Sequence, residues 1–437
     1  MSKLKLGFIA ISGVRAYNKE LTELGLTLPG FIERNKVIAS LPSLGLLTLA
    51  GLTDDNYDID YMEVPEIEDI DKIKKDYDIV AISSFTAKID VAYKLADMFR
   101  EAGTTVVMGG LHVTVMPEEA LGHADSIVIG EGEPMWAKLL FDFRYNRLKR
   151  VYDARGIDYS FENSPMPRFD LLDIKKYNRL TIQTQRGCPH SCNFCGSSRL
   201  LNPRYKTKPI KKIMEELKFI KSVWTDPFIE FADDNTFVNK KHSKALLREL
   251  AKENIKWFTE TDISVADDDE LLALMRDSGC KQILIGLETT NLGVLSNIGT
   301  TNWKARQYDR YYQAIQKIQS YGITVNGTFI LGLDGTGYES FDDVFNFVEK
   351  SGLYEVQVTL QTPFPGTKLY EDLKKAGRLL KENAWELATL FDLNFIPENM
   401  TVKELNTHFS QLVQRLYSKE FTKQRKTQFY QKLGIAR

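Results

Sequence analysis

The feature that most constrains the fold is the repeated alternation of short, wholly apolar runs with helical patterns. Ile79-Val80-Ala81-Ile82 is apolar at every position. A strand that is apolar on both faces must be covered on both faces, which is typical of a parallel sheet between helices. Strand patterns of this kind occupy residues 4–12, 57–62, 78–83, 104–108 and 126–129, with helical patterns at 87–101 and 134–143. The N-terminal part is therefore predicted to be a five-stranded, doubly wound α/β domain with a ligand crevice at the carboxyl ends of its strands.

A second series of strand and helix patterns follows. Strands are expected at residues 180–185, 228–231, 257–261, 282–286, 324–331 and 355–361, and helices at 210–222, 241–253 and 268–278. Six such units predict a partial (β/α)6 barrel, whose chemistry would lie at the C-terminal ends of the strands. The expected organisation is a doubly wound domain (1–148), a connector (149–177), the barrel (178–379) and a small helical C-terminal extension (380–437).

Length and charge narrow the class of protein. The 437 residues fit two domains and an extension. Lys plus Arg (57) nearly balance Asp plus Glu (59), so no nucleic-acid partner is expected. No apolar run approaches the roughly 20 residues of a membrane span, and the N-terminus shows no signal-peptide cleavage pattern. We therefore expect a cytoplasmic protein without a transmembrane segment.

Three of the four cysteines lie within eight residues, directly after the first barrel strand. Cys188, Cys192 and Cys195 have the spacing Cys-x3-Cys-x2-Cys, and clustered thiols in a reducing compartment indicate metal ligands rather than disulfides. Three thiolates on one loop can hold a [4Fe–4S] cluster and leave the fourth iron open. The amino and carboxylate groups of S-adenosylmethionine (SAM) fit that iron, and reduction of its sulfonium would yield a 5′-deoxyadenosyl radical.

Two other interpretations of the cysteine loop were weighed. A zinc site would need a fourth ligand, which His190 could supply, but the spacing is unlike a zinc ribbon. Three incidental thiols would be an improbable cluster in a chain with so few cysteines. Cys280, between a helix and a strand, is interpreted as a buried apolar thiol and not as a fourth cluster ligand.

With these motifs in place, the sequence resembles the radical SAM superfamily, and within it the members that carry an N-terminal cobalamin-binding domain. The resemblance covers nearly the whole chain, and the tail is similar to that of members that include hopanoid methylases. The matching segments are the cysteine loop, Phe231-Ala232-Asp233-Asp234-Asn235-Thr236-Phe237, Ile285-Gly286-Leu287-Glu288-Thr289, Gly327-Thr328-Phe329-Ile330-Leu331-Gly332-Leu333, Thr362-Pro363-Phe364-Pro365-Gly366-Thr367, Gly109-Gly110-Leu111-His112-Val113-Thr114 and Gly130-Glu131-Gly132-Glu133.

The resemblance implies roles for three residues of the barrel. The backbone around Phe194 would lie against the adenine of SAM, and Asp233 and Glu288 would bind its ribose or amino group. Asp233 and Asp234 could instead be helix-capping carboxylates. Glu288 could instead form a structural salt bridge, although its place at the end of a barrel strand favours a functional role.

The resemblance also implies cobalamin in the N-terminal domain. The chain has no histidine before His112, so it lacks the Asp-x-His-x-x-Gly motif of many cobalamin proteins and resembles those methylases that dispense with it. Ser84, Gly109 and Gly110 follow the third and fourth strands and leave room for a large planar ligand. The alternative is a scaffold domain without corrinoid, whose glycines make tight turns.

Four other polar features are given structural interpretations. His112 is expected to be a loop histidine with its hydrogen bonds satisfied, and His190 is not expected to be a catalyst. Glu131 and Glu133 are expected to interact favourably with the dipole of the helix that follows. Residues 419–437 hold six basic residues and one acidic residue, which we interpret as a solvated helix face.

The resemblance predicts a cobalamin-dependent radical SAM methyltransferase that methylates a carbon of a small-molecule or lipid substrate. Its expected partners are that substrate and an electron donor such as flavodoxin or ferredoxin. One alternative is a cobalamin-independent radical SAM enzyme that carries out a cyclisation, rearrangement, dehydrogenation or other SAM-derived group transfer. A second alternative is a non-catalytic Fe–S module. No residue is assigned to catalysis beyond the cofactor sites.

Overall fold

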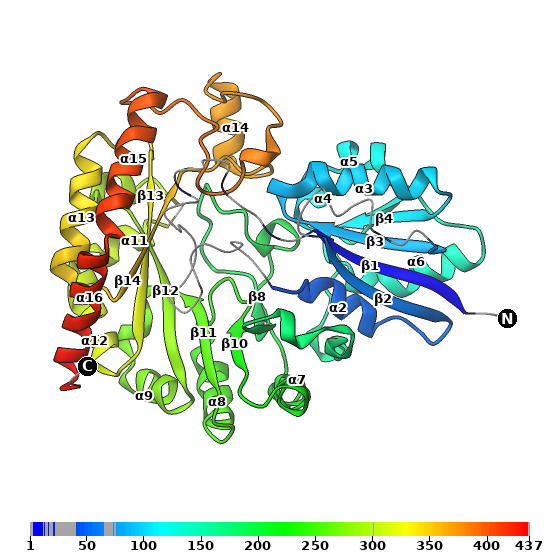
Figure 1. Cartoon of the computed structure of the whole chain (residues 1–437), viewed down its shortest axis with the longest axis horizontal. Coiled ribbons are helices and arrows are strands. Elements are labelled where there is room, and N and C mark those ends of the chain that lie inside the picture. Colours follow the sequence, from blue (N-terminus) through cyan, green and yellow to red (C-terminus); the bar gives the residue numbers. More distant parts are fainter. Residues whose placement is uncertain are drawn as a thin grey trace. The chain divides into compact units, whose positions relative to one another are not determined.

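A computed structural model describes residues 3–11, 13, 16, 21, 41–64, 73, 76–299 and 301–435 (Figure 1). The chain divides into two compact units, each described by itself below. The first consists of Met1–Val14, Ala39–Gly187 and Gly196–Pro227, and the second of Arg15–Ile38, Cys188–Cys195 and Phe228–Arg437. The domain boundaries expected from the sequence stay predictions.

The first unit is built on a parallel sheet with the strand order β2-β1-β3-β4-β5-β6. The order reverses direction between β1 and β3, and at such a switch point a crevice opens at the carboxyl ends of the strands. All five predicted strands are present, but the sheet has a sixth, β6, inside the predicted connector. Its pattern was missed because only Tyr152 of its three residues is buried. The strands are β1 (Leu4–Ile11), β2 (Tyr57–Val64), β3 (Ile79–Ser84), β4 (Thr105–Gly109), β5 (Ser126–Ile129) and β6 (Val151–Asp153).

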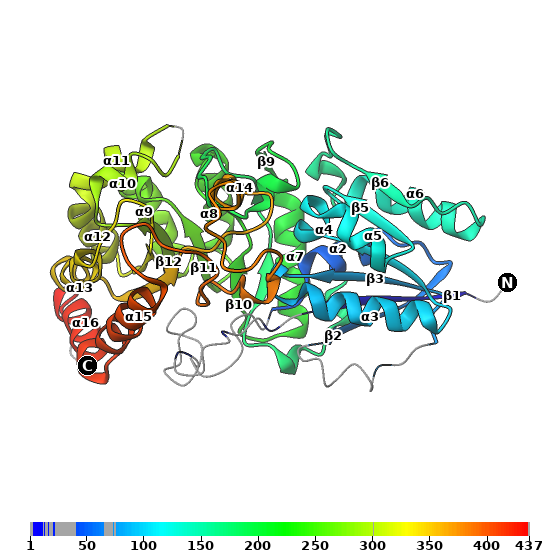
Figure 2. The same ribbon diagram turned by 90° about the horizontal axis from the view of Figure 1, so that it is seen from above.

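Helices cover both faces of this sheet, as the apolar strands predict (Figures 1 and 2). On one face, Phe8 packs against Trp136 at a ring-centroid distance of 5.5 Å, within a core shared by α2 and α6. The other face is covered by α3. The helices of this sheet are α2 (Leu44–Gly51), α3 (Ile89–Glu101), α4 (Leu111–Val115), α5 (Pro117–His123) and α6 (Glu133–Arg144).

The remainder of the first unit leads into and out of the cysteine loop. Strand β7 (Leu180–Ile182) begins where the first barrel strand is expected. Strands β8 (Gln185–Arg186) and β9 (Lys206–Thr207) pair antiparallel on the two sides of the loop in sequence, and α7 (Ile210–Val223) follows them.

The second unit contains five parallel strands that are neighbours in chain order, from β10 to β14. Together with β7, they account for the six strands predicted for the partial barrel. The strands are β10 (Phe228–Phe231), β11 (Lys256–Thr261), β12 (Cys280–Glu288), β13 (Thr324–Leu331) and β14 (Glu355–Leu360). The helices between them are α8 (Lys240–Leu250), α9 (Asp269–Asp277), α10 (Leu292–Leu295), α11 (Trp303–Gln307), α12 (Tyr311–Ser320) and α13 (Glu339–Ser351).

The two faces of these five strands differ in chemistry. On the helix-covered face, Phe329 of β13 packs against Phe347 of α13 at 5.6 Å, and Phe231 of β10 stacks on Trp257 of β11 at 4.9 Å. Side chains alternate along a strand, so the other face carries the residues between these. On that inner face lie polar residues, among them Glu260, Gln282 and Asn326. An apolar outer face and a polar inner face fit a barrel with an interior that binds something polar.

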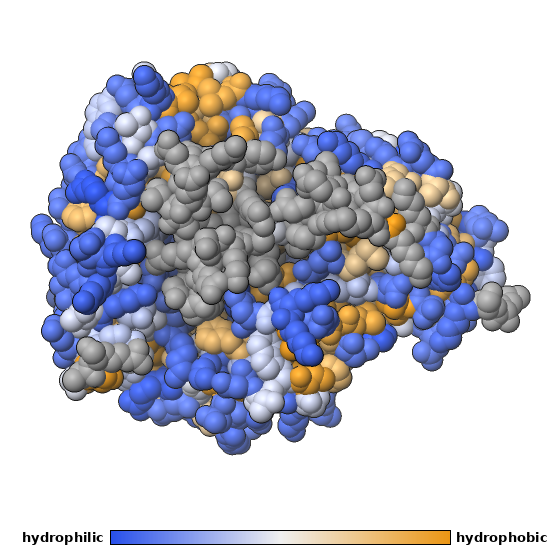
Figure 3. Space-filling model, viewed as in Figure 1, coloured by the Kyte–Doolittle hydropathy of each residue, from blue (hydrophilic) through white to orange (hydrophobic). Residues whose placement is uncertain are grey.

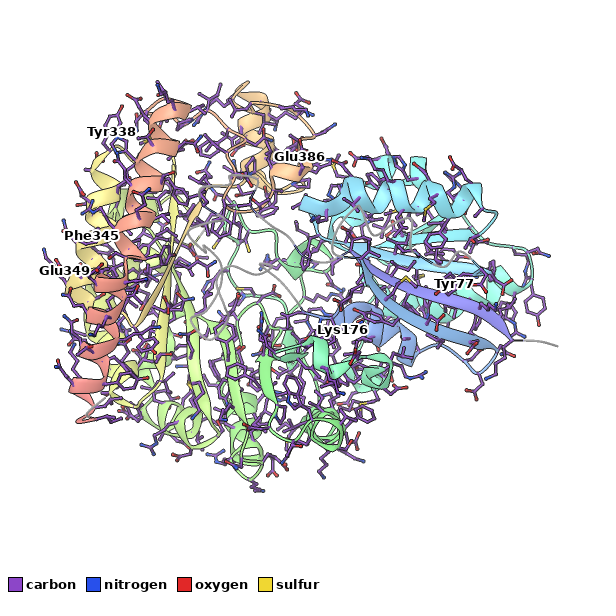
Figure 4. The ribbon with its side chains drawn as sticks, viewed as in Figure 1. Tyr77, Lys176, Tyr338, Phe345, Glu349 and Glu386 are labelled. Carbon is purple, nitrogen blue, oxygen red and sulfur yellow. The ribbon has the colours of Figure 1, made fainter. Side chains whose placement is uncertain are left out.

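The C-terminal extension is helical, as predicted. It comprises α14 (Lys368–Lys375), α15 (Val402–Leu416) and α16 (Lys419–Lys432). Phe345 of α13 (Figure 4) stacks on Phe421 of α16 with ring centroids 4.8 Å apart. The Arg415 guanidinium lies over the Phe345 ring, 4.1 Å from its centroid.

The surface over α15 and α16 is mainly hydrophilic (Figure 3). The interpretation of residues 419–437 as a solvated face holds for Lys419, Lys423 and Lys432, which are exposed. It is wrong for Arg425, which is buried and donates to the Leu416 carbonyl, because its long side chain reaches under the helix. None of the helices in the described part of the chain is both long and apolar enough to cross a membrane.

Candidate functional site

The cysteine loop is tied to two other loops of the second unit. The Asn193 amide donates to the Ile298 carbonyl at 2.9 Å, and Cys192 forms an isolated antiparallel bridge with Gly299. The Leu369 amide, at the start of α14, donates to the Asn193 carbonyl at 2.9 Å. These backbone hydrogen bonds fix the conformation of the middle of the loop, which carries the thiols.

The three thiols form a group with a common electrostatic environment. Cys188 and Cys192 are half-buried and Cys195 is exposed. Burial raises the pKa of Cys192 to about 11; Lys304 opposes this, whereas Glu288, Cys195 and Cys188 add to it. Burial also raises the pKa of Cys188, with a further contribution from Cys195. Thiols that repel one another as thiolates need a cation, which ferric and ferrous iron supply.

Three thiols on one short loop are the donor set that a [4Fe–4S] cluster with one open iron requires. Among the described residues, no three His, Cys, Asp or Glu side chains are grouped closely enough to hold one metal ion. A cubane is larger than an ion and holds its thiolates further apart, so three thiols on one short loop remain suited to it. Cys280 is buried on β12 and has its own contact with the Gln282 carbonyl, which fits the prediction that it is not a ligand.

Beside Cys192 lies a buried ion pair between Glu288 and Lys304. Glu288 ends β12 in a left-handed backbone conformation, with φ of 68°, after a register shift between Gly286 and Glu288. A non-glycine residue in this region is strained and is frequently found at functional sites. Lys304 of α11 binds the Glu288 carboxylate and donates to the Gly286 carbonyl at 2.8 Å. Burial lowers the pKa of Lys304, but Glu288 and Cys192 outweigh this and raise it above its ordinary value.

His190 of the cysteine loop is held from two sides. Its Nε2 atom lies 3.4 Å from the Asp262 carboxylate, and its ring lies 4.6 Å from that of Trp303. Asn235 donates to the same carboxylate at 2.8 Å. Burial alone would raise the pKa of Asp262, but bonds from His190, Ser264 and Asn235 hold it well below its ordinary value. His190 is therefore held in place by contacts with Asp262 and Trp303, and its lack of a catalytic role stays a prediction.

Two other predicted SAM residues lie near the same strand ends. Asp233 is buried after β10 and accepts from the Thr236 hydroxyl at 3.2 Å. Helix α8, which follows, is capped by Asn239, so the alternative that Asp233 is a helix cap is wrong. Phe194 is half-buried on the turn between Cys192 and Cys195. Its predicted contact with adenine is neither supported nor opposed by its neighbours.

The predicted cobalamin residues lie at the switch-point edge of the first unit. Ser84 ends β3, and its hydroxyl donates to the Phe85 carbonyl at 3.0 Å. Gly109 ends β4, and Gly110 has φ of 108°; a Cβ on Gly110 would lie 3.1 Å from the Ser83 hydroxyl. The left-handed backbone of Gly110 therefore suits only a glycine.

Neighbouring loops at this edge are tied together by polar contacts. His112 is buried in α4 between Thr86 and Glu119, each 3.3 Å from a ring nitrogen, which confirms a satisfied histidine. Thr114 donates to the Gly110 carbonyl at 2.8 Å and accepts from the Gly130 amide at 2.9 Å. The loops after β3, β4 and β5 thus hold one another in place at this edge of the sheet.

Glu133 lies in the first turn of α6, where a carboxylate favours the helix dipole as predicted, whereas Glu131 lies before the helix and binds other side chains. Glu131 is buried and accepts from Arg186 at 2.7 Å, from Lys206 at 2.8 Å and from Asn202 at 2.9 Å. Glu133 begins α6 but also pairs with Arg186 at 2.8 Å. We call Glu131, Glu133, Arg186, Asn202 and Lys206 the carboxylate clamp. The sequence pattern missed it because its members are up to 75 residues apart.

Several other residues at the site carry no motif that the sequence could expose. Lys304, Asp262 and Trp303 meet Glu288 or His190 only through the fold. Position after a strand was the one available signal for Asp262, since it follows β11 directly. The arrangement as a whole places a thiol loop, a buried ion pair and two carboxylates at the strand ends of a barrel, which can hold a cluster and a polar cosubstrate.

Comparisons with known proteins agree with this geometry. The radical SAM superfamily matches residues 182–348, and a B12-binding domain matches residues 34–140. A domain of unknown function (DUF4070) matches residues 367–437.

The similar proteins include methyltransferases and two anaerobic magnesium-protoporphyrin IX monomethyl ester cyclases. Bacteriochlorophyllide d C-8(2)-methyltransferase of Chlorobaculum tepidum is 29% identical over 359 residues, which are 79% of this chain and 78% of that protein. Hopanoid C-2 methylase of Rhodopseudomonas palustris is 27% identical over 369 residues, which are 79% of this chain and 67% of that protein. A similar solved structure is that of the radical SAM methyltransferase TsrM of Kitasatospora setae, with cobalamin and a [4Fe–4S] cluster bound. Its TM-score is 0.65 at 14% sequence identity, and the match covers 86% of this chain and 75% of that chain.

The chain contains a radical SAM domain and a B12-binding domain, and the proteins similar to it include cobalamin-binding radical SAM methyltransferases. The predicted family and class of enzyme, and the order of a B12-binding domain, a radical SAM barrel and a helical extension, are confirmed. The family's solved structures include bound [4Fe–4S] cluster, SAM analogue and cobalamin.

Proposed function

We propose that this enzyme methylates a carbon atom of a small-molecule or lipid substrate. The observation that carries the proposal is the thiol loop: three cysteines on a loop held by Ile298, Gly299 and Leu369, with Cys192 beside the Glu288–Lys304 pair. The names of two relatives, which refer to numbered carbons of a bacteriochlorophyllide and a hopanoid, support carbon as the acceptor.

Each cofactor has a proposed set of residues. Cys188, Cys192 and Cys195 would hold the [4Fe–4S] cluster. Phe194, Asp233 and Glu288 would bind SAM, and Ser84, Gly109 and Gly110 would line the cobalamin crevice. When bound, the cluster and SAM supply a 5′-deoxyadenosyl radical that removes hydrogen from the substrate, and the corrinoid supplies the methyl group.

The protein's own contribution is to position these groups and to exclude water. Lys304 neutralises Glu288, which allows a carboxylate to remain at the strand end beside anionic thiolates. The Glu288 carboxylate can accept from an ammonium or ribose hydroxyl without leaving Lys304, because a carboxylate has several lone pairs. The reductant for the cluster would be flavodoxin or ferredoxin, and we propose that the enzyme works in the cytoplasm.

The proposal is tested by a matched pair of cysteine variants, purified without oxygen and with cobalamin supplied. Cys192→Ala should lose the brown cluster absorbance and all 5′-deoxyadenosine formation, since two thiolates cannot retain the cubane. Cys280→Ala is the control and should keep both, because Cys280 lies buried on β12 away from the loop. Iron, sulfide and cobalt per chain are measured in each preparation.

A SAM-site variant refines the test. Glu288→Gln should weaken SAM binding by about tenfold while iron content stays at the level of the unmodified protein, because a charge-assisted bond is lost without touching a ligand. Full SAM cleavage by Cys192→Ala, or iron loss in Glu288→Gln, would contradict the assignments. Wild-type protein that cleaves SAM but binds no cobalt would contradict methyl transfer by a corrinoid.

A further inference from the structure

Two amide side chains on the inner face of the second unit have buried atoms that form no hydrogen bond with any described residue. Asn326 of β13 is 1% exposed, and neither its Nδ2 nor its Oδ1 atom has a partner. Gln282 of β12 is 3% exposed, and its Oε1 atom has none. An unpaired buried polar group destabilises the folded protein, and such groups are few in native proteins. Their occurrence on one face of a sheet therefore calls for an explanation.

The strand register places these amides in one region with a carboxylate. Asn326 lies opposite Leu284 of β12, and Leu284 lies opposite Glu260 of β11. Gln282 is two residues before Leu284 and thus on the same face. Glu260 and Asn326 are two strands apart, about 10 Å. All three side chains lie on the face opposite to Phe329, which contacts α13. We call Glu260, Gln282 and Asn326 the inner polar triad.

Glu260 is surrounded by protein yet reaches solvent. Part of the Glu260 side chain is exposed to solvent. The protein around it nevertheless raises the pKa of its carboxyl to about 7, through burial first and then through Glu230 and Asp234. Both observations hold if the side chain lines an enclosed space rather than the outer surface. Among the described residues, no hydrogen bond or ion pair is formed by its carboxylate. Glu260 therefore lacks the counter-charge that buried carboxylates normally have.

The triad offers mostly acceptors. Glu260 has two carboxylate oxygens, and Gln282 and Asn326 each have a carbonyl oxygen without a partner; the Asn326 amide nitrogen is the one fully buried donor of the three side chains without a partner among the described residues. Glu230 and Asp234 make the surroundings more negative. A hydrocarbon would leave every one of these groups unpaired, whereas an ammonium or guanidinium group would satisfy them and neutralise Glu260.

We propose that the inner polar triad binds an amine- or guanidine-bearing, hydrogen-bond-rich end of the substrate. The inference rests on the proposed function, since it names the class of substrate for the same barrel. It assigns Glu260 as the counter-ion and Asn326 and Gln282 as the groups that fix orientation. A purely hydrocarbon substrate is excluded by the same chemistry.

The first experiment tests whether the Gln282 side chain contributes to the stability of the ligand-free protein. It compares leucine substitutions at two buried glutamines. Gln282→Leu should leave the melting temperature of the ligand-free full-length protein unchanged or raise it by about 2 °C, because it removes an unpaired group. Gln319→Leu should lower it by at least as much. Gln319 is equally buried, but it donates to the Gly352 carbonyl at 2.8 Å and accepts from the Tyr354 amide at 2.9 Å. Equal destabilisation by both variants would overturn the proposal.

The second experiment measures binding of a probe to the reconstituted holoenzyme by calorimetry. Agmatine, which carries an amine and a guanidinium, should bind, and 1,4-dimethoxybutane, which has acceptors only, should not. Glu260→Gln and Asn326→Leu should each weaken agmatine binding by about tenfold. Glu249→Gln, which removes a carboxylate from the exposed face of α8, should leave it unchanged. Binding of both probes, of neither, or of agmatine without dependence on Glu260 would refute the inference.

The two proposals can fail separately. Cleavage of SAM by the wild-type protein without any added probe tests the proposed function alone. If that cleavage occurs and agmatine does not bind, the enzyme is a radical SAM methyltransferase whose substrate is not cationic. If agmatine binds but no SAM is cleaved, the triad binds amines and the proposed function is wrong.

Discussion

Two regions of the molecule bury polar side chains to the same extent but in opposite ways. In the carboxylate clamp of the first unit, Glu131 is 2% exposed and each of its oxygens accepts hydrogen bonds, from Arg186, Lys206 and Asn202. In the inner polar triad of the second unit, Asn326 is 1% exposed and its amide has no partner. Satisfied polar groups contribute to stability, whereas unsatisfied ones reduce it.

We infer from this difference that the carboxylate clamp stabilises the fold, whereas the inner polar triad binds a ligand. Arg186 of β8 lies two residues before Cys188, and the Lys206 opposite it in β9 binds the same carboxylate. The Arg186 guanidinium also lies 4.8 Å from the ring centre of Phe161. The clamp thus fixes the strand that leads into the cysteine loop. The triad lies on β11, β12 and β13, where we propose that it contacts the substrate.

The largest expected effect comes from breaking the clamp. Glu131→Ala would leave Arg186 and Lys206 buried with too little negative charge, and we expect a loss of about 3–5 kcal/mol in the free energy of unfolding. Chemical denaturation of the full-length protein measures it. Lys368→Ala, which removes an exposed pair with Asp372, is the control and should change stability by less than about 0.5 kcal/mol. A loss as small as that of the control would show that the clamp is not structural.

A smaller effect is expected from a conservative change in the same clamp. Arg186→Lys keeps the positive charge but removes the guanidinium, whose two terminal nitrogens bind Glu131 and Glu133. The single ammonium of lysine cannot reproduce this geometry. We expect a loss of about 1–2 kcal/mol and, because Arg186 leads into the cysteine loop, an altered electron paramagnetic resonance spectrum of the reduced cluster. An unchanged spectrum with the predicted loss of stability would confine the clamp to a structural role.

The smallest effect concerns the pH dependence set by the triad. The pKa of Glu260 is about 7 in the folded protein, above the value of roughly 4.3 for an unfolded chain. Between these values the folded state binds more protons than the unfolded state, so stability falls as the pH rises. Glu260→Gln should flatten the curve of melting temperature against pH from 5 to 7.5 and stabilise the protein at pH 7.5 by less than about 1 kcal/mol, since the carboxyl reaches solvent. Parallel curves for the two proteins would contradict a raised pKa.

Much of the architecture could be predicted because it is encoded in local patterns. The apolar run Ile79–Ile82 lies within β3, and the segment 324–331 coincides with β13. The Cys188–Cys195 spacing lies within a single loop, so no long-range information was needed to predict it. Strand β6 was missed because one buried residue in three gives no period, and Arg425 was misplaced because charge alone does not reveal a buried stem.

What the sequence determined by itself was the class of fold, the thiol loop and the family, since all three depend on residue type and spacing along the chain. Only the tertiary structure decided which polar residues meet. Glu131 meets Arg186 and Lys206, and Glu288 meets Lys304, although these residues come from different elements. Strand order and register place Gln282, Asn326 and Glu260 on one face of the sheet. Whether a buried polar group is satisfied depends on its neighbours in space, which spacing along the chain does not specify.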